Sequence, residues 1–161
     1  MVTCSNRSAA GARPDGSGEV LAGGLAEAGH EVVYRVVVPD HVEAIRRSVR
    51  EALAAGAEVV LTTGGTGLTP TDVTPEAVGP LLDREVPGIA EAVRAVSRET
   101  VPTSMLSRGV AGTIGTALVV TLPGSPGGAR DGLAVLLPVL RHAADQLAGG
   151  DHPAAPETAP E

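Results

Sequence analysis

The chain has 161 residues, enough for one domain with a sizeable core and no need of disulfides. It has a single aromatic residue and a net charge of −7, which argues against modules that stack bases and against proteins that neutralise a phosphate backbone. All twelve basic residues are arginine, which excludes a Walker-type lysine, a Schiff-base lysine and a lysine general base. The one cysteine, Cys4, allows no internal disulfide and no cysteine zinc site.

Two further sequence patterns indicate where the protein resides and where its domain ends. No apolar run approaches the ~18 residues that span a bilayer, and no charged-then-apolar leader opens the chain, so we expect a soluble cytoplasmic protein with no membrane partner. Residues 149–161 are rich in proline, alanine and acids and have no apolar face. We therefore expect one domain over residues 1–148 and a disordered, non-catalytic tail over 149–161.

The first half of the chain alternates apolar strands with amphipathic helices. A strand, a crossover helix and a second strand of these lengths form the right-handed unit of a parallel sheet. The predicted elements are the back half of a buried strand at 1–4, a polar loop at 5–18, a helix ending at Gly29, a strand buried on both faces at 31–38, a helix from Val42 to near Gly56 and a strand at 58–62.

The second half opens with the longest loop, from Thr63 to Thr74. Thr74 is the predicted N-cap of a helix with Pro75 at its first position. A helix from Pro87 follows, with Ile89, Val93 and Val96 on one face, and then a hairpin of strands at 112–114 and 117–122. The last predicted helix covers 125–147, and Pro138 should kink or split it. The whole pattern predicts an α/β domain.

Four polar loops follow predicted strands, and ligands bind at the carboxyl ends of strands in an open parallel sheet. The loops are Ser5-Asn6-Arg7, Pro39-Asp40, Thr62 to Gly67, and Pro123 to Pro126. In the third loop the three glycines would let backbone N–H groups close on an anion, with the Thr66 hydroxyl as a further donor. A tight turn after a buried strand would explain the same glycines, so both interpretations stay open.

The other loop residues also have two interpretations. Asp40 fits a capping box with Glu43, and Asp72 fits a turn, yet two carboxylates beside a phosphate loop would also suit Mg²⁺. Ser125 is a natural N-cap or one donor of a second anion site at a helix N-terminus. Arg108 is either a solvated charge or a cation that neutralises phosphate. The four histidines show no metal-ligand spacing.

With these loops laid out, the chain resembles the molybdopterin adenylyltransferase family of the MogA/MoaB type, from about Val2 to Gly149. The signature is Thr62-Thr63-Gly64-Gly65-Thr66-Gly67 followed by Asp72-Val73-Thr74-Pro75-Glu76-Ala77. Supporting segments are Val38-Pro39-Asp40, Asp83 to Gly88, Leu106-Ser107-Arg108 and Leu122 to Pro126. The resemblance implies a three-layer α/β/α sandwich with a mostly parallel central sheet, commonly assembled as a homotrimer.

The resemblance also implies an activity, in which AMP passes from Mg-ATP to molybdopterin and pyrophosphate is released during molybdenum cofactor synthesis. A transient contact with a molybdenum insertase goes with that pathway. Asp40 and Asp72 match the family's catalytic and Mg²⁺-linked acids. The positions matching nucleotide- and pterin-contacting segments are Ser5, Thr63, Gly64, Gly65, Thr66, Gly67, Thr74, Glu76, Ser107, Arg108, Pro123, Gly124 and Ser125. This chain departs from the family at Asn6, where an aspartate is usual, so any anionic role there is lost.

Two other functions remain open on the sequence. The chain could be a molybdopterin-binding paralogue with little or no transfer activity. It could also be a nucleotide pyrophosphatase resembling the competence-damage-inducible family, which shares a Gly-Gly loop and a downstream Asp-x-Thr. Thr66-Gly67 and Thr74-Pro75-Glu76 argue against that second alternative.

Overall fold

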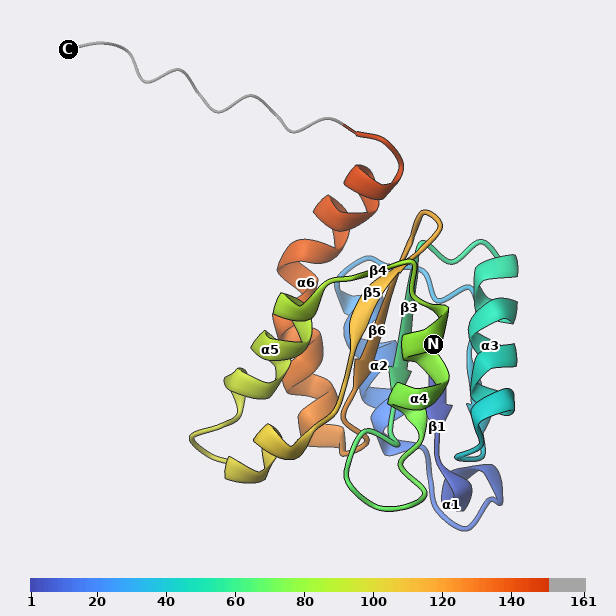
Figure 1. Ribbon diagram of the computed structural model, residues 1–161, viewed down its shortest axis with the longest axis vertical. Helices are drawn as coiled ribbons and strands as arrows, with labels where there is room; N and C mark the ends of the chain where they lie inside the picture. The colour runs from blue at the N-terminus through green and yellow to red at the C-terminus, as the bar shows by residue number, and fades with distance from the viewer. Residues whose placement is uncertain (151–161) are drawn as a thin grey trace, which may run out of the picture.

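The computed structural model describes residues 1–150, and the predicted tail from 151 onward lies outside the described residues. A six-stranded sheet forms the middle layer, in the spatial order β2-β1-β3-β6-β5-β4 (Figure 1). The strands are β1 (Val2–Cys4), β2 (Val36–Val38), β3 (Val59–Thr63), β4 (Arg84–Glu85), β5 (Ala111–Ile114) and β6 (Ala117–Leu122). Neighbours among β2, β1, β3 and β6 pair in parallel, whereas β5 is antiparallel to both β6 and β4. The sheet is thus mostly parallel, as predicted.

Helices cover both faces of the sheet (Figure 1). On one face α3 (Val42–Ala54) and α4 (Thr74–Val78) pack over Val2, Val60 and Val119. On the other face lie α2 (Gly16–Glu27), α5 (Pro87–Val96) and α6 (Pro126–Leu147), over Leu61 and Val120. The remaining elements are the short helix α1 (Asn6–Ala9) and the 3₁₀ turns η1 (Gly79–Leu81) and η2 (Pro102–Leu106). The predicted three-layer α/β/α sandwich is confirmed.

The two cores are aliphatic, as a chain with a single aromatic residue requires. Leu133, Leu136 and Leu140 of α6 are at most 4 % exposed and face α2 and the sheet. Pro138 lies inside α6, which continues through it as one element of 22 residues. The expected split is therefore wrong. The helix tolerates the proline on an exposed position, where its ring does not disturb the buried leucine face. None of the helices within residues 1–150 is both long and apolar enough to cross a membrane.

Three predicted boundaries are wrong for tertiary reasons. The strand expected at 31–38 is shortened to Val36–Val38, because β1 pairs with it only from Val2 onward and leaves residues 31–35 without a strand to join. The loop expected at 5–18 contains α1 and the start of α2, which is capped by Asp15. Val96, expected on the inner face of α5, is 51 % exposed, because the chain leaves the helix there.

Candidate active site

The parallel strands β1, β2, β3 and β6 end at one edge of the sheet, and their loops enclose a cleft of about 520 Å³. All four loops predicted from the sequence contribute to this cleft. Its lining includes Ser5, Asn6, Asp40, Gly64, Gly65, Thr66, Gly67, Asp72, Gly124 and Ser125. Residues as far apart as Ser5 and Ser125 therefore meet in one cleft because the strands that precede them are parallel.

The glycine loop after β3 has a backbone that only glycine adopts without strain. Gly64 and Gly65 have φ angles of +98° and +63°. A Cβ on Gly64 would overlap the carbonyl oxygen of Cys4, and one on Gly65 would overlap the Thr74 hydroxyl. We expected the Gly64 amide to face an anion, but it donates to the carbonyl of Leu122 (3.1 Å). That part of the prediction is wrong, because the amide ties the loop to the end of β6.

The next three amides of this loop are different. Within residues 1–150, the backbone N–H groups of Gly65, Thr66 and Gly67 form no hydrogen bond, although these residues line the cleft. Thr66 is only 5 % exposed. Partly buried N–H groups usually have a partner, so three successive unpaired donors are suited to a ligand with acceptor oxygens. The arrangement favours anion binding over a simple turn.

Asp40 does not cap the helix that follows it. The N-cap of α3 is His41, which makes no side-chain cap bond. The Asp40 carboxylate instead accepts from the backbone N–H of Asn6 (2.8 Å), and the Asn6 side-chain oxygen accepts from the backbone N–H of Asp40 (3.0 Å). The capping-box interpretation is therefore wrong, and the carboxylate joins the first two loops of the cleft. Its second oxygen, Oδ1, faces Gly65, where a Cβ would lie 3.3 Å away.

Asp72 closes the far end of the glycine loop. Its Oδ2 accepts from the backbone N–H (2.8 Å) and the hydroxyl (2.7 Å) of Thr69, so the turn interpretation is confirmed. The same oxygen would lie 2.8 Å from a Cβ on Gly67, and this close approach explains the third glycine. Within residues 1–150 no hydrogen bond reaches the other oxygen, Oδ1, so turn formation leaves it available for a ligand.

Thr74 and Arg108 hold the loop from behind. Thr74 is fully buried and its hydroxyl donates to the Gly64 carbonyl (2.8 Å), so it is not the predicted N-cap; Val73 takes that position. The guanidinium of Arg108 donates through Nε to the Gly67 carbonyl (2.7 Å) and through Nη2 to the Asp72 carbonyl, and pairs through Nη1 with Glu76. The hydrogen bond from Arg108 holds the pKa of the Glu76 carboxyl below its usual range.

The loop after β6 completes the floor. The Pro123 carbonyl accepts from the Thr63 hydroxyl (2.7 Å), and a Cβ on Gly124 would lie 2.8 Å from the Cα of Gly64, so the two loops are in direct contact. Ser125 caps α6 by accepting from the Gly128 amide (3.1 Å). The capping interpretation is confirmed. It places the positive end of a 22-residue helix at the cleft, where an anion is stabilised.

A second cavity of about 320 Å³ adjoins the cleft and shares Thr66, Gly67 and Ser125 with it. Its wall is mainly apolar, with Val93, Val101, Leu106 and Pro123, and its polar side chains include Ser107 and Asp131. Ser107 lies here rather than in the cleft, and its hydroxyl accepts from the Gly109 amide (3.3 Å). Arg94 fixes this segment by donating to the carbonyls of Ser107 and Gly109.

The carboxylates of the cleft suit a magnesium ion held together with substrate. Asp40 and Asp72 each have one oxygen used by a backbone donor and one that faces the cleft without a donor among residues 1–150. No group of three or more His, Cys, Asp or Glu side chains able to hold a metal occurs in the same residues. Magnesium binds through one or two carboxylates, water and substrate phosphates, so this pair fits it.

Two arginine side chains that line the cleft were not among the predicted site residues. Arg7 and Arg13 line the cleft and are exposed. Arg7 stands in a loop that the sequence had singled out, yet it carried no predicted role. Arg13 precedes a proline in a loop between two helices, where nothing in the local sequence points to a site. Only the packing of that loop against the strand ends reveals it.

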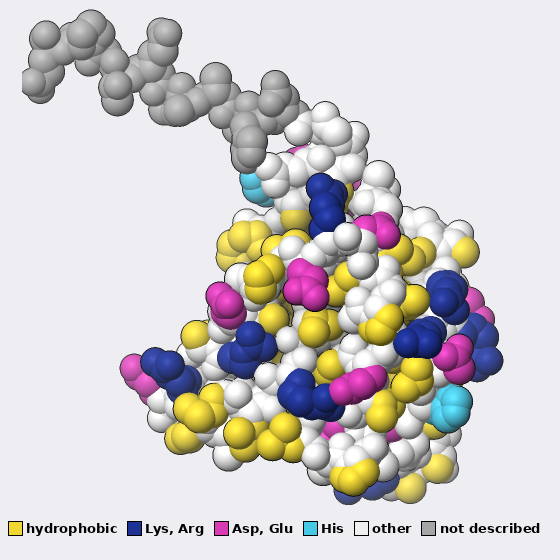
Figure 2. Space-filling model, viewed as in Figure 1, with side chains coloured by type: hydrophobic (Ala, Val, Ile, Leu, Met, Phe, Trp, Pro, Cys, Tyr) yellow, Lys and Arg dark blue, Asp and Glu magenta, His cyan; other side chains and the backbone are white. Residues whose placement is uncertain are grey.

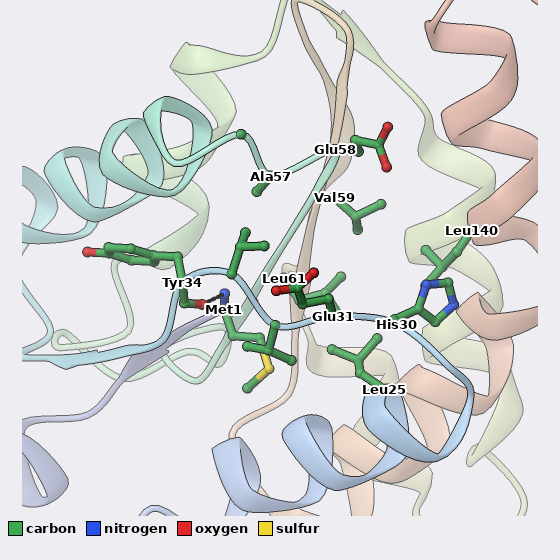
Figure 3. A pocket seen from close by; sticks show the side chains of 13 residues that line it. Met1, Leu25, His30, Glu31, Tyr34, Ala57, Glu58, Val59, Leu61 and Leu140 are labelled. Atoms are coloured by element: carbon green, nitrogen blue, oxygen red, sulfur yellow. Dashed lines mark hydrogen bonds between the residues drawn. The ribbon is translucent and has the colours of Figure 1, made fainter.

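Other candidate sites are not supported by the geometry. Burial raises the pKa of the Cys4 thiol to about 12, so the thiol stays protonated and is no nucleophile. A separate cavity of about 250 Å³ lies at the opposite edge of the sheet, between Met1, Leu25, Leu61 and Leu140 (Figure 3). Its lining also includes His30, Glu31, Tyr34 and Glu58, but none of the predicted site residues lines it.

The fold and the cleft define a class, namely α/β proteins with a polar cleft at the carboxyl edge of a mostly parallel sheet. Within that class, residues 1–142 match the family described as "Probable molybdopterin binding domain". The chain is 46 % identical to molybdenum cofactor biosynthesis protein B of Escherichia coli K12, over 78 % of this chain and 74 % of that protein. It is 37 % identical to a protein named molybdopterin adenylyltransferase in Pyrococcus furiosus, over 89 % of each chain.

A solved structure titled as the anomalous substructure of MogA superposes with a TM-score of 0.86, at 46 % identity, over 91 % of this chain and 96 % of that one. The chain therefore belongs to the molybdopterin-binding family of the MogA/MoaB type, whose members take part in molybdenum cofactor biosynthesis. It spans about half the length of the bifunctional cofactor-biosynthesis protein of Chlorobaculum tepidum, which it matches at 38 % identity.

Proposed function

We propose that this chain transfers the adenylyl group of ATP to molybdopterin, giving adenylyl-molybdopterin and pyrophosphate. One observation carries the proposal: three unpaired loop amides, at Gly65, Thr66 and Gly67, line the same cleft as the carboxylates of Asp40 and Asp72. Anion donors beside carboxylates are what a reaction between two phosphate groups needs, because such reactions depend on positioning and charge neutralisation. The adenylyltransferase name of the Pyrococcus relative supports the same choice.

The reaction requires little chemical participation by protein side chains. An oxygen of the terminal phosphate of molybdopterin forms a bond to the α-phosphorus of ATP, and the bond from that phosphorus to the bridging oxygen breaks to release pyrophosphate. The attacking phosphate is already ionised at neutral pH, so neither a protein nucleophile nor a general base is required. This agrees with a buried, protonated Cys4 and with the lack of lysine in the chain.

The residues of the cleft then act by binding and orienting. The amides of Gly65 to Gly67 donate to phosphate oxygens, and the N-terminus of α6 favours the negative charge. Arg108 and Thr74 keep the loop in its donor conformation. Asp40 and Asp72 would hold a magnesium ion, which would supply further charge neutralisation.

The two adjoining cavities suit two ligands placed end to end. The cleft is lined mainly by polar groups and backbone, which suits phosphates, whereas the second cavity has the apolar wall that a flat ring requires. Because both cavities share Thr66, Gly67 and Ser125, a ligand in either cavity would lie next to the glycine loop.

The direct test is incubation of the protein with molybdopterin, ATP and Mg²⁺, followed by mass-spectrometric detection of the adenylated product. Asp72→Asn should lower the transfer rate by roughly 10²–10³-fold, the cost typical of removing one electrostatic group of a transition state. The asparagine oxygen can still accept from Thr69, so the fold should survive. The matched control is Asp145→Asn, a substitution of the same kind that lies near the end of α6 and outside both cavities.

Three outcomes would contradict the proposal. Full activity of Asp72→Asn would remove this carboxylate from the mechanism. Tight binding of molybdopterin by the wild-type protein without any transfer from Mg-ATP would indicate a non-reacting paralogue. Conversion of ADP-ribose to AMP would indicate a nucleotide pyrophosphatase.

A further inference from the structure

We infer that Arg7 and Arg13 are the cations that hold the phosphate chain of the nucleotide, a role that the sequence alone suggested for Arg108. The inference rests on the proposed function for the identity of the ligand. The chemistry it names is broader, because two guanidinium groups beside free amides would bind any di- or triphosphate.

Arg108 has little capacity left for a ligand. Its Nε and Nη2 atoms donate to the carbonyls of Gly67 and Asp72, and its Nη1 atom pairs with the carboxylate of Glu76. Its backbone N–H donates to the Thr66 carbonyl (2.8 Å). A guanidinium that turned towards a phosphate would have to give up these contacts and release the glycine loop that the phosphate needs.

Arg7 and Arg13 are in the opposite situation. Both line the cleft, and within residues 1–150 neither guanidinium forms a hydrogen bond or an ion pair. Exposed Arg35 pairs with Glu19 (2.7 Å), whereas exposed Arg50 forms no ion pair within residues 1–150, so what distinguishes Arg7 and Arg13 is that their unpaired guanidinium groups line the cleft. Two unpaired cations lining one cleft of an acidic protein are therefore available for an anionic ligand.

The backbone that carries Arg7 is well fixed. Ser5 caps α1 by accepting from the Ser8 amide (3.2 Å), and the reciprocal pair of bonds between Asn6 and Asp40 ties that helix to the end of β2. Arg7 thus directly follows Asn6, whose backbone N–H binds the carboxylate of Asp40. This placement brings a phosphate-binding cation next to a carboxylate suited to a metal ion, as binding of a metal-bound phosphate chain requires.

The charge balance of the site supports the same assignment. The chain carries a net charge of −7, and two of its carboxylates, Asp40 and Asp72, lie within the cleft. A polyphosphate approaching these carboxylates would be repelled unless cations offset them. Arg7 and Arg13 offset both, and because they are exposed their effect should weaken as salt is added.

The test is calorimetric titration of the full chain with inorganic pyrophosphate, with and without Mg²⁺, so that no molybdopterin is needed. Arg7→Gln and Arg13→Gln should each weaken binding by about tenfold, the scale of one charge-assisted contact, and the double variant should weaken it further. Arg7→Lys and Arg13→Lys should recover part of the loss. Arg50→Gln is the matched control: it removes an exposed arginine of α3 that lines neither cavity.

Unchanged pyrophosphate affinity in the double variant would overturn the inference, and so would an equal loss in Arg50→Gln, because the effect would then be one of net charge. The proposed function fails separately. If the wild-type protein binds pyrophosphate through both arginines but shows no adenylyl transfer, the inference about the arginines stands and the proposed transfer activity is rejected. If the double variant transfers AMP with an unaltered KM for ATP, the transfer activity stands and the inference about the arginines is rejected.

Discussion

Arg108 connects three separate parts of the site through one guanidinium. It contacts the carbonyls of Gly67 and Asp72 and the carboxylate of Glu76, while its backbone N–H contacts Thr66. Glycine-rich segments lose much conformational entropy on folding, so such a loop needs contacts from outside itself to keep one conformation. Arg108 and the buried Thr74 provide them, which explains why both belong to the site without facing the ligand.

Arg108→Gln should therefore lower the free energy of unfolding by about 1–3 kcal/mol, the cost of unpaired partners around a removed charged donor. It should also lower kcat/KM for adenylyl transfer at least tenfold, because the loop loses the conformation in which its amides bind phosphate. Arg108→Lys should restore little of the stability or activity, because a single ammonium group cannot make the several contacts of the forked guanidinium. Urea unfolding and steady-state kinetics measure both effects. A selective rise in KM with unchanged stability would instead make Arg108 a direct phosphate ligand.

Glu76 gives a prediction for the dependence of stability on pH. Its carboxyl has a pKa lowered by the hydrogen bond from Arg108, so the ionised form is favoured in the folded protein. This contribution is present at neutral pH and is lost as the pH falls through the lowered pKa. The difference in unfolding free energy between wild type and Glu76→Gln should accordingly shrink in acid. A difference that stays constant down to low pH would show that the ion pair adds nothing to stability.

At the scale of elements, the turn from β3 to α4 is the feature on which the site depends. Its first two glycines have positive φ angles, and Gly64 also lies against the Cys4 carbonyl oxygen. Position 64 therefore requires glycine for two separate reasons: its φ angle is positive, and the Cys4 carbonyl leaves no room for a Cβ atom. A comparison between two glycines of positive φ can separate them, because Gly56 (φ +85°) has nothing within 4 Å of the place a Cβ would take.

Gly56→Ala should cost about 1–2 kcal/mol of unfolding free energy, the strain of a left-handed residue alone. Gly64→Ala should cost about 1–3 kcal/mol more, because the backbone of β1 must move to admit the methyl group. Chemical denaturation of both variants measures the difference. Equal losses would mean that the contact with Cys4 relaxes freely, and that the positive φ angle alone accounts for glycine at position 64.

The errors of sequence interpretation are also clearest at this scale. Asp40 and Thr74 both look like caps of the helices that follow them, and neither is one. Each side chain instead joins two loops: Asp40 contacts Asn6, and Thr74 contacts Gly64. A local pattern predicts a local bond, and it cannot register a partner that another strand brings within reach. Where no such partner competes, as at Ser125, the predicted cap is correct.

At the scale of the whole molecule, the face that Figure 2 shows carries scattered charges of both signs and no basic stripe. Hydrophobic side chains gather on the same face over η2 and the end of α5 (Figure 2). Val96, Val101, Met105 and Leu106 there are between 48 % and 58 % exposed. Exposed apolar side chains in one region are typical of surfaces that contact another protein.

The homotrimer implied by the family resemblance stays a prediction, and it belongs to this scale. Light scattering coupled to gel filtration should give three times the 16.0 kDa of one chain. The backbone amides around η2 should then be protected from hydrogen exchange at high protein concentration and less protected on dilution. A mass of one chain at every concentration would contradict the prediction and leave these side chains for a different partner.

The sequence by itself determined the α/β class, the parallel pairing of successive strands in the first half and the loops that form the site, and the family resemblance implied the three layers. Hydrophobic periodicity and strand length depend on nearest neighbours along the chain, and loops after parallel strands must share an edge. Only the tertiary structure decided which donors remain free. The Gly64 amide is bound to Leu122 and the Arg108 side chain to the loop it supports, whereas the guanidinium groups of Arg7 and Arg13 form no hydrogen bond or ion pair within residues 1–150. The availability of a donor depends on what packs against it, and the residues that pack here are far apart in sequence.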